Sequence, residues 1–186
     1  MTTTAVETAT GYRTGTWTID AVHSTVGFVA RHMMVSKVRG KFGVVEGTIV
    51  TAENPLESTA TATIDLSTVD TGNAQRDAHL RSADFFTVEK DKTMTFTSTA
   101  IEADGEGYTV TGDLTLNGTT KPVTFALELE GFGPDPYGGV RAGFTGTGSL
   151  SRKEWGITFN GAIEGGGVVV SDKIDLVLEI EAVLAS

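Results

Sequence analysis

Basic side chains that could bind an anion gather in two parts of this sequence. Residues 21–45 contain two Arg, two Lys and two His but no Asp or Glu. A later segment carries three more basic groups and one opposing carboxylate: Arg76, Asp77, His79 and Arg81. If that segment folds as a helix beside the second strand, its three basic groups and His32 form a cationic collar suited to a phosphate or carboxylate head group. The alternative is a solvated strand face, with ion pairs between helix residues four apart.

The histidines do not match a metal site or a catalytic triad. The chain has only His23, His32 and His79, at spacings that fit no metal signature, and it contains no HExxH motif. Asp20, His23 and Ser24 are neighbours in the sequence, but no GxSxG nucleophile motif accompanies them. We therefore expect no metal, no catalytic residue and no enzymatic activity.

Composition limits the function classes further. The chain has 186 residues, enough for one domain, and a formal net charge of −10, which disfavours binding to nucleic acid. It has no Cys, so disulfides and thiolate chemistry are excluded. No apolar run is long enough for a transmembrane helix. Residues 1–14 read as a flexible tail before a single domain over residues 15–186.

The start of the chain also bears on location. It has neither the basic region nor the apolar region of a signal peptide. We expect a cytoplasmic protein, or a periplasmic or secreted one if the start is truncated.

Alternation of apolar and polar residues indicates an antiparallel β protein. Short Gly-containing turns separate successive segments, as in consecutive hairpins, and one helix is expected over residues 72–82 with Asn73 as its cap. A second weak helical piece lies near residues 152–156. Eight or nine strands suggest a sandwich or a closed barrel. The strands are long for a sandwich, and closure removes aggregation-prone edges. The expected strands are 15–20, 24–36, 38–50, 58–67, 93–101, 107–116, 122–130, 140–151 and 173–183.

The period of two also predicts which side chains face the barrel interior. Small residues such as Ala60 and Ala62 share the inner face with large ones, so the interior is either a cavity or tightly packed. A ligand in such a cavity is long and apolar, because few polar groups point inward. The predicted apolar lining is Phe28, Phe42, Ile64, Met94, Phe96, Leu114, Phe125 and Phe144.

Four sequence blocks, taken in order, resemble those of the YceI-like family. The first reads Trp-x-Ile-Asp-x-x-His-Ser from Trp17, and His32 follows it at the expected distance. The second block spans residues 76–86, and the third is a Leu-Thr…Gly…Thr-Lys-Pro hairpin within 112–123. The fourth spans residues 152–157, Arg-Lys-Glu-Trp-Gly-Ile.

This resemblance implies an extended lipocalin-like antiparallel β-barrel of about eight strands with one or two short helices. It also implies a pocket for a polyisoprenoid or similar amphiphilic lipid, used in transport, storage or stress protection. Members of the family are often dimeric, and the family has no established catalytic activity. On this basis we expect a bound lipid in place of a cofactor, with the head group near His32, Arg76, His79 and Arg81, and a homodimer.

Two alternatives remain open at this stage. The barrel could hold a quinone- or haem-type cofactor, or catalyse a reaction, with His32 or His79 as axial ligand or base. It could also be a stress-induced scaffold for other proteins whose interior is filled by its own side chains. The volume inside the barrel separates this scaffold from a lipid-binding protein.

Overall fold

The computed structural model describes residues 9–43, 45–161 and 167–186. Within them the chain forms ten β-strands, one α-helix and three short 3₁₀ helices. The strands are β1 (Gly15–Ile19), β2 (Thr25–His32), β3 (Ser36–Phe42), β4 (Val45–Thr51), β5 (Thr59–Asp65), β6 (Thr93–Asp104), β7 (Gly107–Leu116), β8 (Thr119–Pro134), β9 (Val140–Ser151) and β10 (Lys173–Leu184).

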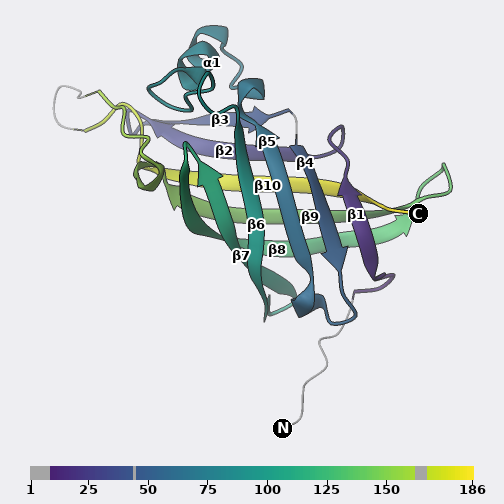
Figure 1. Cartoon of the computed structure of the whole chain (residues 1–186). Helices are drawn as coiled ribbons and strands as arrows, with labels where there is room; N and C mark the ends of the chain where they lie inside the picture. Colours follow the sequence, from purple (N-terminus) through teal and green to yellow (C-terminus); the bar gives the residue numbers. More distant parts are fainter. Residues whose placement is uncertain (1–8, 44, 162–166) are drawn as a thin grey trace.

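Eight of the strands in the described ranges close into an antiparallel barrel. They follow the order β1-β4-β5-β6-β7-β8-β9-β10, and β1 pairs with β10 to complete the ring (Figure 1). The β2–β3 hairpin continues the sheet from the edge of β10 that also carries β1. The predicted barrel of about eight strands is confirmed. Strands β1 and β2 pair with successive parts of the same edge of β10. On their other sides, β1 pairs with β4 and β2 pairs with β3.

Several of the expected strand boundaries are wrong, including the end of 93–101, which extends to Asp104 in β6. The chain turns at residues 33–35, so the segment expected to be one strand over 24–36 ends at His32. The segment 38–50 divides into β3 and β4. The strand expected over 122–130 extends at both ends and forms β8, with a bulge near Glu130.

Local sequence chemistry explains the elements that were predicted correctly. Helix α1 (Ala74–Arg81) begins at Asn73, whose side chain accepts a hydrogen bond from the backbone N–H of Arg76 at 2.9 Å. Asn117 and Gly118 both take positive φ values of 52° and 72°, the geometry of a two-residue hairpin between β7 and β8. The 3₁₀ helices are η1 (Pro55–Glu57), η2 (Leu66–Thr68) and η3 (Arg152–Trp155), the last of which matches the second predicted helical piece.

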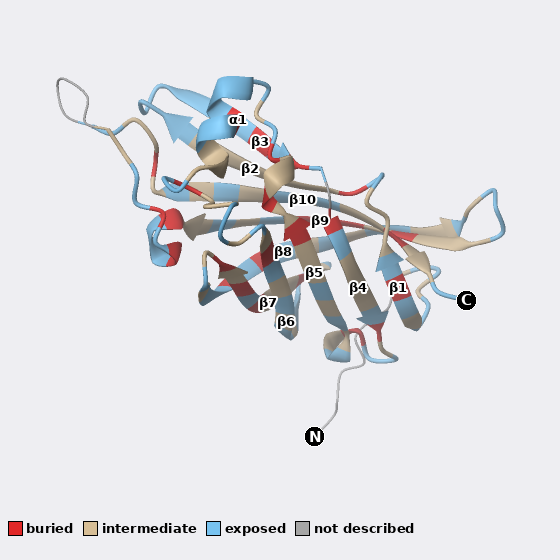
Figure 2. Ribbon diagram, turned by 45° about the horizontal axis from the view of Figure 1, so that its top comes forward, coloured by how far each residue is buried: buried red, intermediate tan, exposed pale blue. Residues whose placement is uncertain are grey.

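The buried side chains form two clusters inside the barrel. The larger lies at the end covered by α1 and includes Phe42, Ile64, Leu114 and Trp155. The smaller lies where the barrel closes and is built from Trp17, Ala142, Phe144 and Ala182. Figure 2 shows buried positions alternating with exposed ones along the strands, as expected when one face of a sheet is covered and the other solvated.

The segment before β1 also contacts the barrel. The hydroxyl of Tyr12 donates to the backbone oxygen of Ala52 at 2.7 Å, and its ring lies 5.5 Å from that of Phe132. The predicted tail of residues 1–14 therefore includes a residue that packs on the folded domain, while residues 1–8 lie outside the described residues. In the described parts of the chain, no helix has the length and apolar character needed to cross a membrane.

Trp17 is the side chain on which closure of the barrel can be tested. It is fully buried beside the β1–β10 pairing, and its Nε1 donates to Thr51 Oγ1 at 2.8 Å. We expect Trp17→Ala to lower the free energy of unfolding by about 3–5 kcal/mol, as large-to-small core substitutions do. Urea unfolding followed by circular dichroism measures this loss. The neighbouring exposed control, Thr18→Ala, should lose less than about 1 kcal/mol, and equal losses in the two variants would contradict the assigned role of Trp17.

Candidate functional site

An elongated cavity of about 290 Å³ lies inside the barrel. Its wall includes Ile174, Leu176, Leu178 and Ile180, alternate residues of β10 that span roughly 20 Å at the usual rise of a strand. At one end it reaches side chains of α1 and the turn after it, and at the other it reaches Tyr12 and Pro55. The shape and the apolar wall suit a long, flexible, apolar ligand.

This volume shows that the barrel does not fill its interior with its own side chains. Protein cores normally pack at crystal-like density with few voids larger than a water molecule. The unfilled volume therefore argues against a scaffold whose interior is filled by its own side chains.

The cavity brings the predicted apolar lining together. Its eight members come from seven strands that are distant in the sequence, and each has a side chain on the cavity wall. They are Phe28, Phe42, Ile64, Met94, Phe96, Leu114, Phe125 and Phe144. Their contact with a ligand stays a prediction. Ala60 and Ala62 on β5 also line the wall, so these small residues leave room instead of packing against a partner.

The predicted head-group contacts, in contrast, do not lie on the described wall of the cavity. His32 keeps the inward parity of β2 but is exposed, because β2 runs beyond the end of the barrel. Arg76 is exposed and donates to the side-chain and backbone oxygens of Thr71 at 2.7 and 2.8 Å. Arg81, half-buried at the last position of α1, is also absent from the wall.

His79 is held just outside the cavity. Its Nε2 lies 2.8 Å from Asp84 Oδ2, and its ring packs edge-on against Phe85 and Phe159. Phe85 itself lines the cavity, so His79 supports the wall from behind. Because neither His32 nor His79 faces the cavity, the geometry does not support an axial ligand or a general base there.

Arg152 is the charged side chain on the cavity wall that the sequence reasoning missed. It is only 4% exposed, and four of its N–H groups donate to backbone carbonyls. These acceptors are the oxygens of Ser171 (2.9 Å), Ile157 (3.0 Å), Phe159 (2.8 Å) and Val170 (3.3 Å). A guanidinium has five N–H donors, so one Nη2 hydrogen has no acceptor among the described residues.

The charge of Arg152 is also without an ion pair in the described residues. Burial lowers the pKa of Arg152 from its usual value, and the nearby charge of Asp172 acts in the opposite direction. Burying a cation that forms no direct ion pair is costly, and an acceptor or anion beside it would reduce that cost. The sequence did offer one indication that this residue matters, since Arg152 is the first residue of the fourth family-like block.

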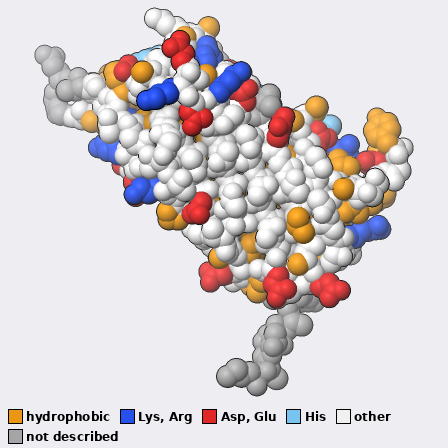
Figure 3. Space-filling model, in the orientation of Figure 1, with side chains coloured by type: hydrophobic (Ala, Val, Ile, Leu, Met, Phe, Trp, Pro, Cys, Tyr) orange, Lys and Arg blue, Asp and Glu red, His pale blue; other side chains and the backbone are white. Residues whose placement is uncertain are grey.

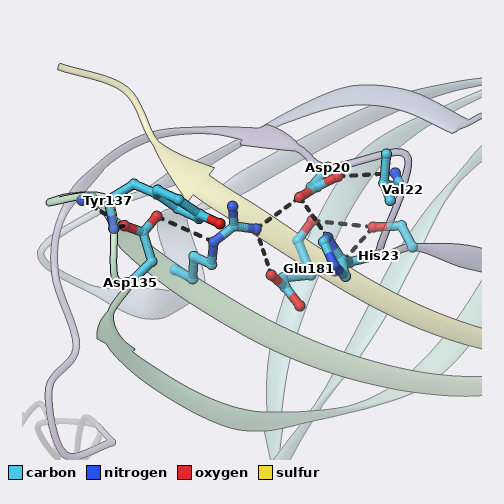
Figure 4. Close-up of polar contacts among 9 residues, drawn as sticks. Asp20, Val22, His23, Asp135, Tyr137 and Glu181 are labelled. Atoms are coloured by element: carbon cyan, nitrogen blue, oxygen red, sulfur yellow. Dashed lines mark hydrogen bonds and ion pairs between the residues drawn. The ribbon is translucent and has the colours of Figure 1, made fainter.

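A second polar cluster lies at the seam where β1 meets β10 (Figure 4). Arg141 Nη1 donates to Asp20 Oδ2 at 2.7 Å and to Glu181 Oε1 at 2.6 Å, while its Nε donates to Asp135 at 3.2 Å. His23 Nδ1 lies 2.9 Å from Asp20. The ligand atoms of Asp20, His23 and Glu181 are close enough for a metal ion, but Arg141 already supplies the positive charge. The cluster therefore fastens the seam of the barrel.

A YceI-like domain matches residues 17–182. Protein YceI of Escherichia coli is 43% identical over 162 residues, which cover 87% of this chain and 82% of that protein. A UPF0312 protein of Photorhabdus laumondii is 43% identical over 166 residues, 89% of this chain and 83% of its own length.

Solved structures share the fold. The crystal structure of Burkholderia cenocepacia BcnA aligns with a TM-score of 0.76 at 23% identity, covering 88% of this chain and 98% of that one. A domain from Saccharophagus degradans, described as polyisoprenoid binding and implicated in plant cell wall breakdown, aligns with a TM-score of 0.68 at 18% identity. That alignment covers 93% of this chain and 100% of the domain.

The seam cluster predicts a specific response to acid. The hydrogen bond from Arg141, and then that from His23, hold the pKa of Asp20 well below its ordinary value. A carboxylate with a depressed pKa in the folded state stabilises the protein above its unfolded pKa, about 3.9, and loses that contribution as the pH falls further. We expect the free energy of unfolding to fall below about pH 4 more steeply in the native protein than in Asp20→Asn.

Urea unfolding at a series of pH values measures the difference. Asp113→Asn, which changes an exposed carboxylate on β7, is the matched control and should follow the native protein. If the pH curves of Asp20→Asn and the native protein run parallel, Asp20 does not act as the seam carboxylate.

Proposed function

This chain belongs to the YceI-like family, and we propose that it binds a polyisoprenoid or another long-chain amphiphilic lipid inside the barrel. The observation that carries the proposal is the apolar cavity of about 290 Å³. The description of the Saccharophagus degradans domain as polyisoprenoid binding supports the choice of ligand class. Binding, for transport, storage or stress protection, is proposed in preference to catalysis, because the described wall presents no histidine and one charged side chain.

Energetics favour a tail of substantial length. Transfer of roughly 300 Å² of apolar tail out of water contributes about 7–8 kcal/mol before the costs of association. The wall offers no pattern of polar groups that would select one apolar chain over another. Specificity is therefore expected to depend on the length of the tail and on the head group.

We further propose that Arg152 binds the head group. It is the charged residue on the described wall, it is buried, and it keeps one N–H donor unused. A phosphate or carboxylate accepts such a donor in a charge-assisted hydrogen bond, which is about twice as strong as a neutral one. The head group thus occupies the end of the cavity near η3, and the tail extends toward Tyr12.

Filling the cavity should prevent lipid binding without unfolding the protein. Ala62 lines the wall opposite Phe96 on the neighbouring strand, so Ala62→Phe places a ring where the tail is expected. Organic extraction and mass spectrometry of the purified protein should recover lipid from the native chain and little from this variant. Thr95→Phe, an exposed position on β6, is the matched control and should retain its lipid.

The binding proposal fails if the native protein yields no lipid and stays empty when offered polyprenols, quinones and fatty amides. It also fails if Ala62→Phe and Thr95→Phe retain equal amounts.

The head-group proposal is tested by pairs of ligands that share a tail. The native protein should bind a polyprenyl phosphate more tightly than the matching polyprenol, and Arg152→Gln should lose about tenfold or more of that preference. Arg152→Lys keeps the charge and should retain part of it. Fluorescence displacement measures the affinities, and circular dichroism checks that each variant is folded. If Arg152→Gln keeps the full preference for phosphate, the head group binds elsewhere.

A further inference from the structure

The tip of the β2–β3 hairpin exposes apolar side chains at an energetically unfavourable turn. Met33, Met34 and Val35 are 41%, 52% and 82% exposed. Met33 and Met34 both take positive φ values, 50° and 61°, a conformation that Asn or Gly adopts far more readily than Met. A turn that served only to reverse the chain would be more stable with Asn-Gly at these positions. The tip therefore carries large apolar groups at a cost to stability.

The outer face of the same hairpin carries four cations. Arg31 lies directly across from Lys37 in the strand register, and Arg39 and Lys41 continue the same face of β3. All four are exposed, and none belongs to an ion pair among the described residues. Like charges directly opposite one another destabilise a sheet, so folding does not explain this arrangement.

Acidic groups on neighbouring segments offset these cations only in part: Asp70 lies directly across from Lys41 in an isolated antiparallel bridge, and no ion pair joins the two among the described residues. The hairpin itself, residues 25–42, contains no Asp or Glu. Asp175 on β10 lies opposite Val29 in register, but it pairs with Lys173 at 3.3 Å. The next acidic group on that face of β10, Glu179, lies opposite Thr25, at the far end of β2 from the tip.

Charge is also distributed unequally between the two ends of the barrel. In Figure 3 several Lys and Arg side chains lie beside α1, among Asp and Glu side chains of the same end. The loops at the opposite end present Asp and Glu without Lys or Arg, namely Glu53 and Glu57 beside η1, and Asp104 and Glu106 between β6 and β7. A negatively charged surface would therefore attract the hairpin and repel the loops at the opposite end.

The tip is connected to the proposed head-group end of the cavity. The N–H of Met33 donates to the oxygen of Val169 at 2.9 Å. The next residue, Val170, lines the cavity and accepts a hydrogen bond from Arg152. The exposed side chain of Val168 extends the apolar surface beside the tip.

We propose that the β2–β3 hairpin docks the protein on an anionic lipid bilayer, with Met33, Met34 and Val35 inserted at the interface and Arg31, Lys37, Arg39 and Lys41 against the lipid phosphates. Exposed apolar groups flanked by cations are the combination that interfacial membrane binding requires. An acidic protein partner would use the cations but would not require the exposed methionines. Docking rests on the surface alone, and it gives the proposed lipid function a route between membrane and cavity.

Vesicle sedimentation tests the proposal. The native protein should sediment with vesicles of phosphatidylcholine mixed with phosphatidylglycerol, less with phosphatidylcholine alone, and less at high salt. Met33→Asn combined with Met34→Gly should weaken binding about tenfold or more by removing apolar area. The same pair should raise the midpoint of urea unfolding, because Asn and Gly adopt the positive φ of these two positions more readily than Met. These opposite changes separate loss of docking from loss of folding.

A second variant tests the charges. Arg31→Thr with Lys37→Thr should weaken binding roughly 25-fold, from the usual contribution of each cation near an anionic surface. Tyr137→Asn is the control for an exposed apolar group on another hairpin, since Tyr137 is 88% exposed in the β8–β9 turn. It should bind vesicles as the native protein does.

Three results would overturn the proposal: no sedimentation of the native protein with anionic vesicles at low salt, unchanged binding of both hairpin variants, or equal loss in Tyr137→Asn. Analytical ultracentrifugation identifies a further contrary result. If the hairpin variants abolish self-association but leave vesicle binding unchanged, the surface contacts a second copy of the chain. Extraction of lipid from the same samples keeps the two proposals separate, because a protein that docks but contains no lipid contradicts only the cavity proposal.

Discussion

Closure of the sheet between β1 and β10 is the constraint on which the rest of the molecule depends. Among the described residues this seam comprises only three residue pairs, from Trp17 with Leu184 to Ile19 with Ala182. The seam is reinforced from both sides, by the buried Trp17 inside and by the Arg141 carboxylate cluster outside. Without closure, the inner face of β10 would meet water and no enclosed apolar volume would exist. A short seam therefore needs strong side-chain interactions.

The interior of the barrel is only partly packed, so unfilled volume is kept at a cost to the stability of the free protein. Two clusters of fully packed residues lie at the α1 end and at the seam, and the cavity extends past both. Small residues on β5 leave space where a self-packed barrel would place large ones. Arg152 adds a second cost, because a buried guanidinium without an ion pair is retained on an apolar wall. Under the proposed function, both costs would fall when an amphiphile with an accepting head group enters, and the features that weaken the free protein would strengthen binding.

The sequence predicted the fold and the apolar lining because both follow from a period of two and from local turn chemistry. Inward parity alone identified Phe28, Phe96 and Phe144, and Asn117-Gly118 identified its own hairpin. The alternation of faces wrongly placed His32 in the cavity. Alternation shows which face of the strand a residue takes, but not where the strand extends beyond the barrel. The turn at Met33 and Met34 gave no signal, since methionine rarely adopts positive φ.

The head-group end could not be derived by the same reasoning. Arg152 lies in a 3₁₀ turn, where no periodicity indicates direction, and its partners are backbone carbonyls that no residue type reveals. The basic residues that composition made conspicuous occupy the outside of the same end. The basic residues on the outside and Arg152 on the inside are nevertheless linked, because Val169 and Val170 connect the hairpin tip to Arg152.

Taken together, the two proposals would set a direction for the lipid. With the hairpin on a bilayer and the head group held by Arg152, the head stays near the membrane surface while the tail lies along β10 toward Tyr12. The polar group then need not cross the apolar cavity, where an unpaired charge or hydroxyl would meet no partner along most of the wall. Entry and release therefore require movement of the tail alone past the head-group end. The acidic loops at the other end keep that end away from an anionic surface, so the same charge asymmetry that favours docking also orients the cavity.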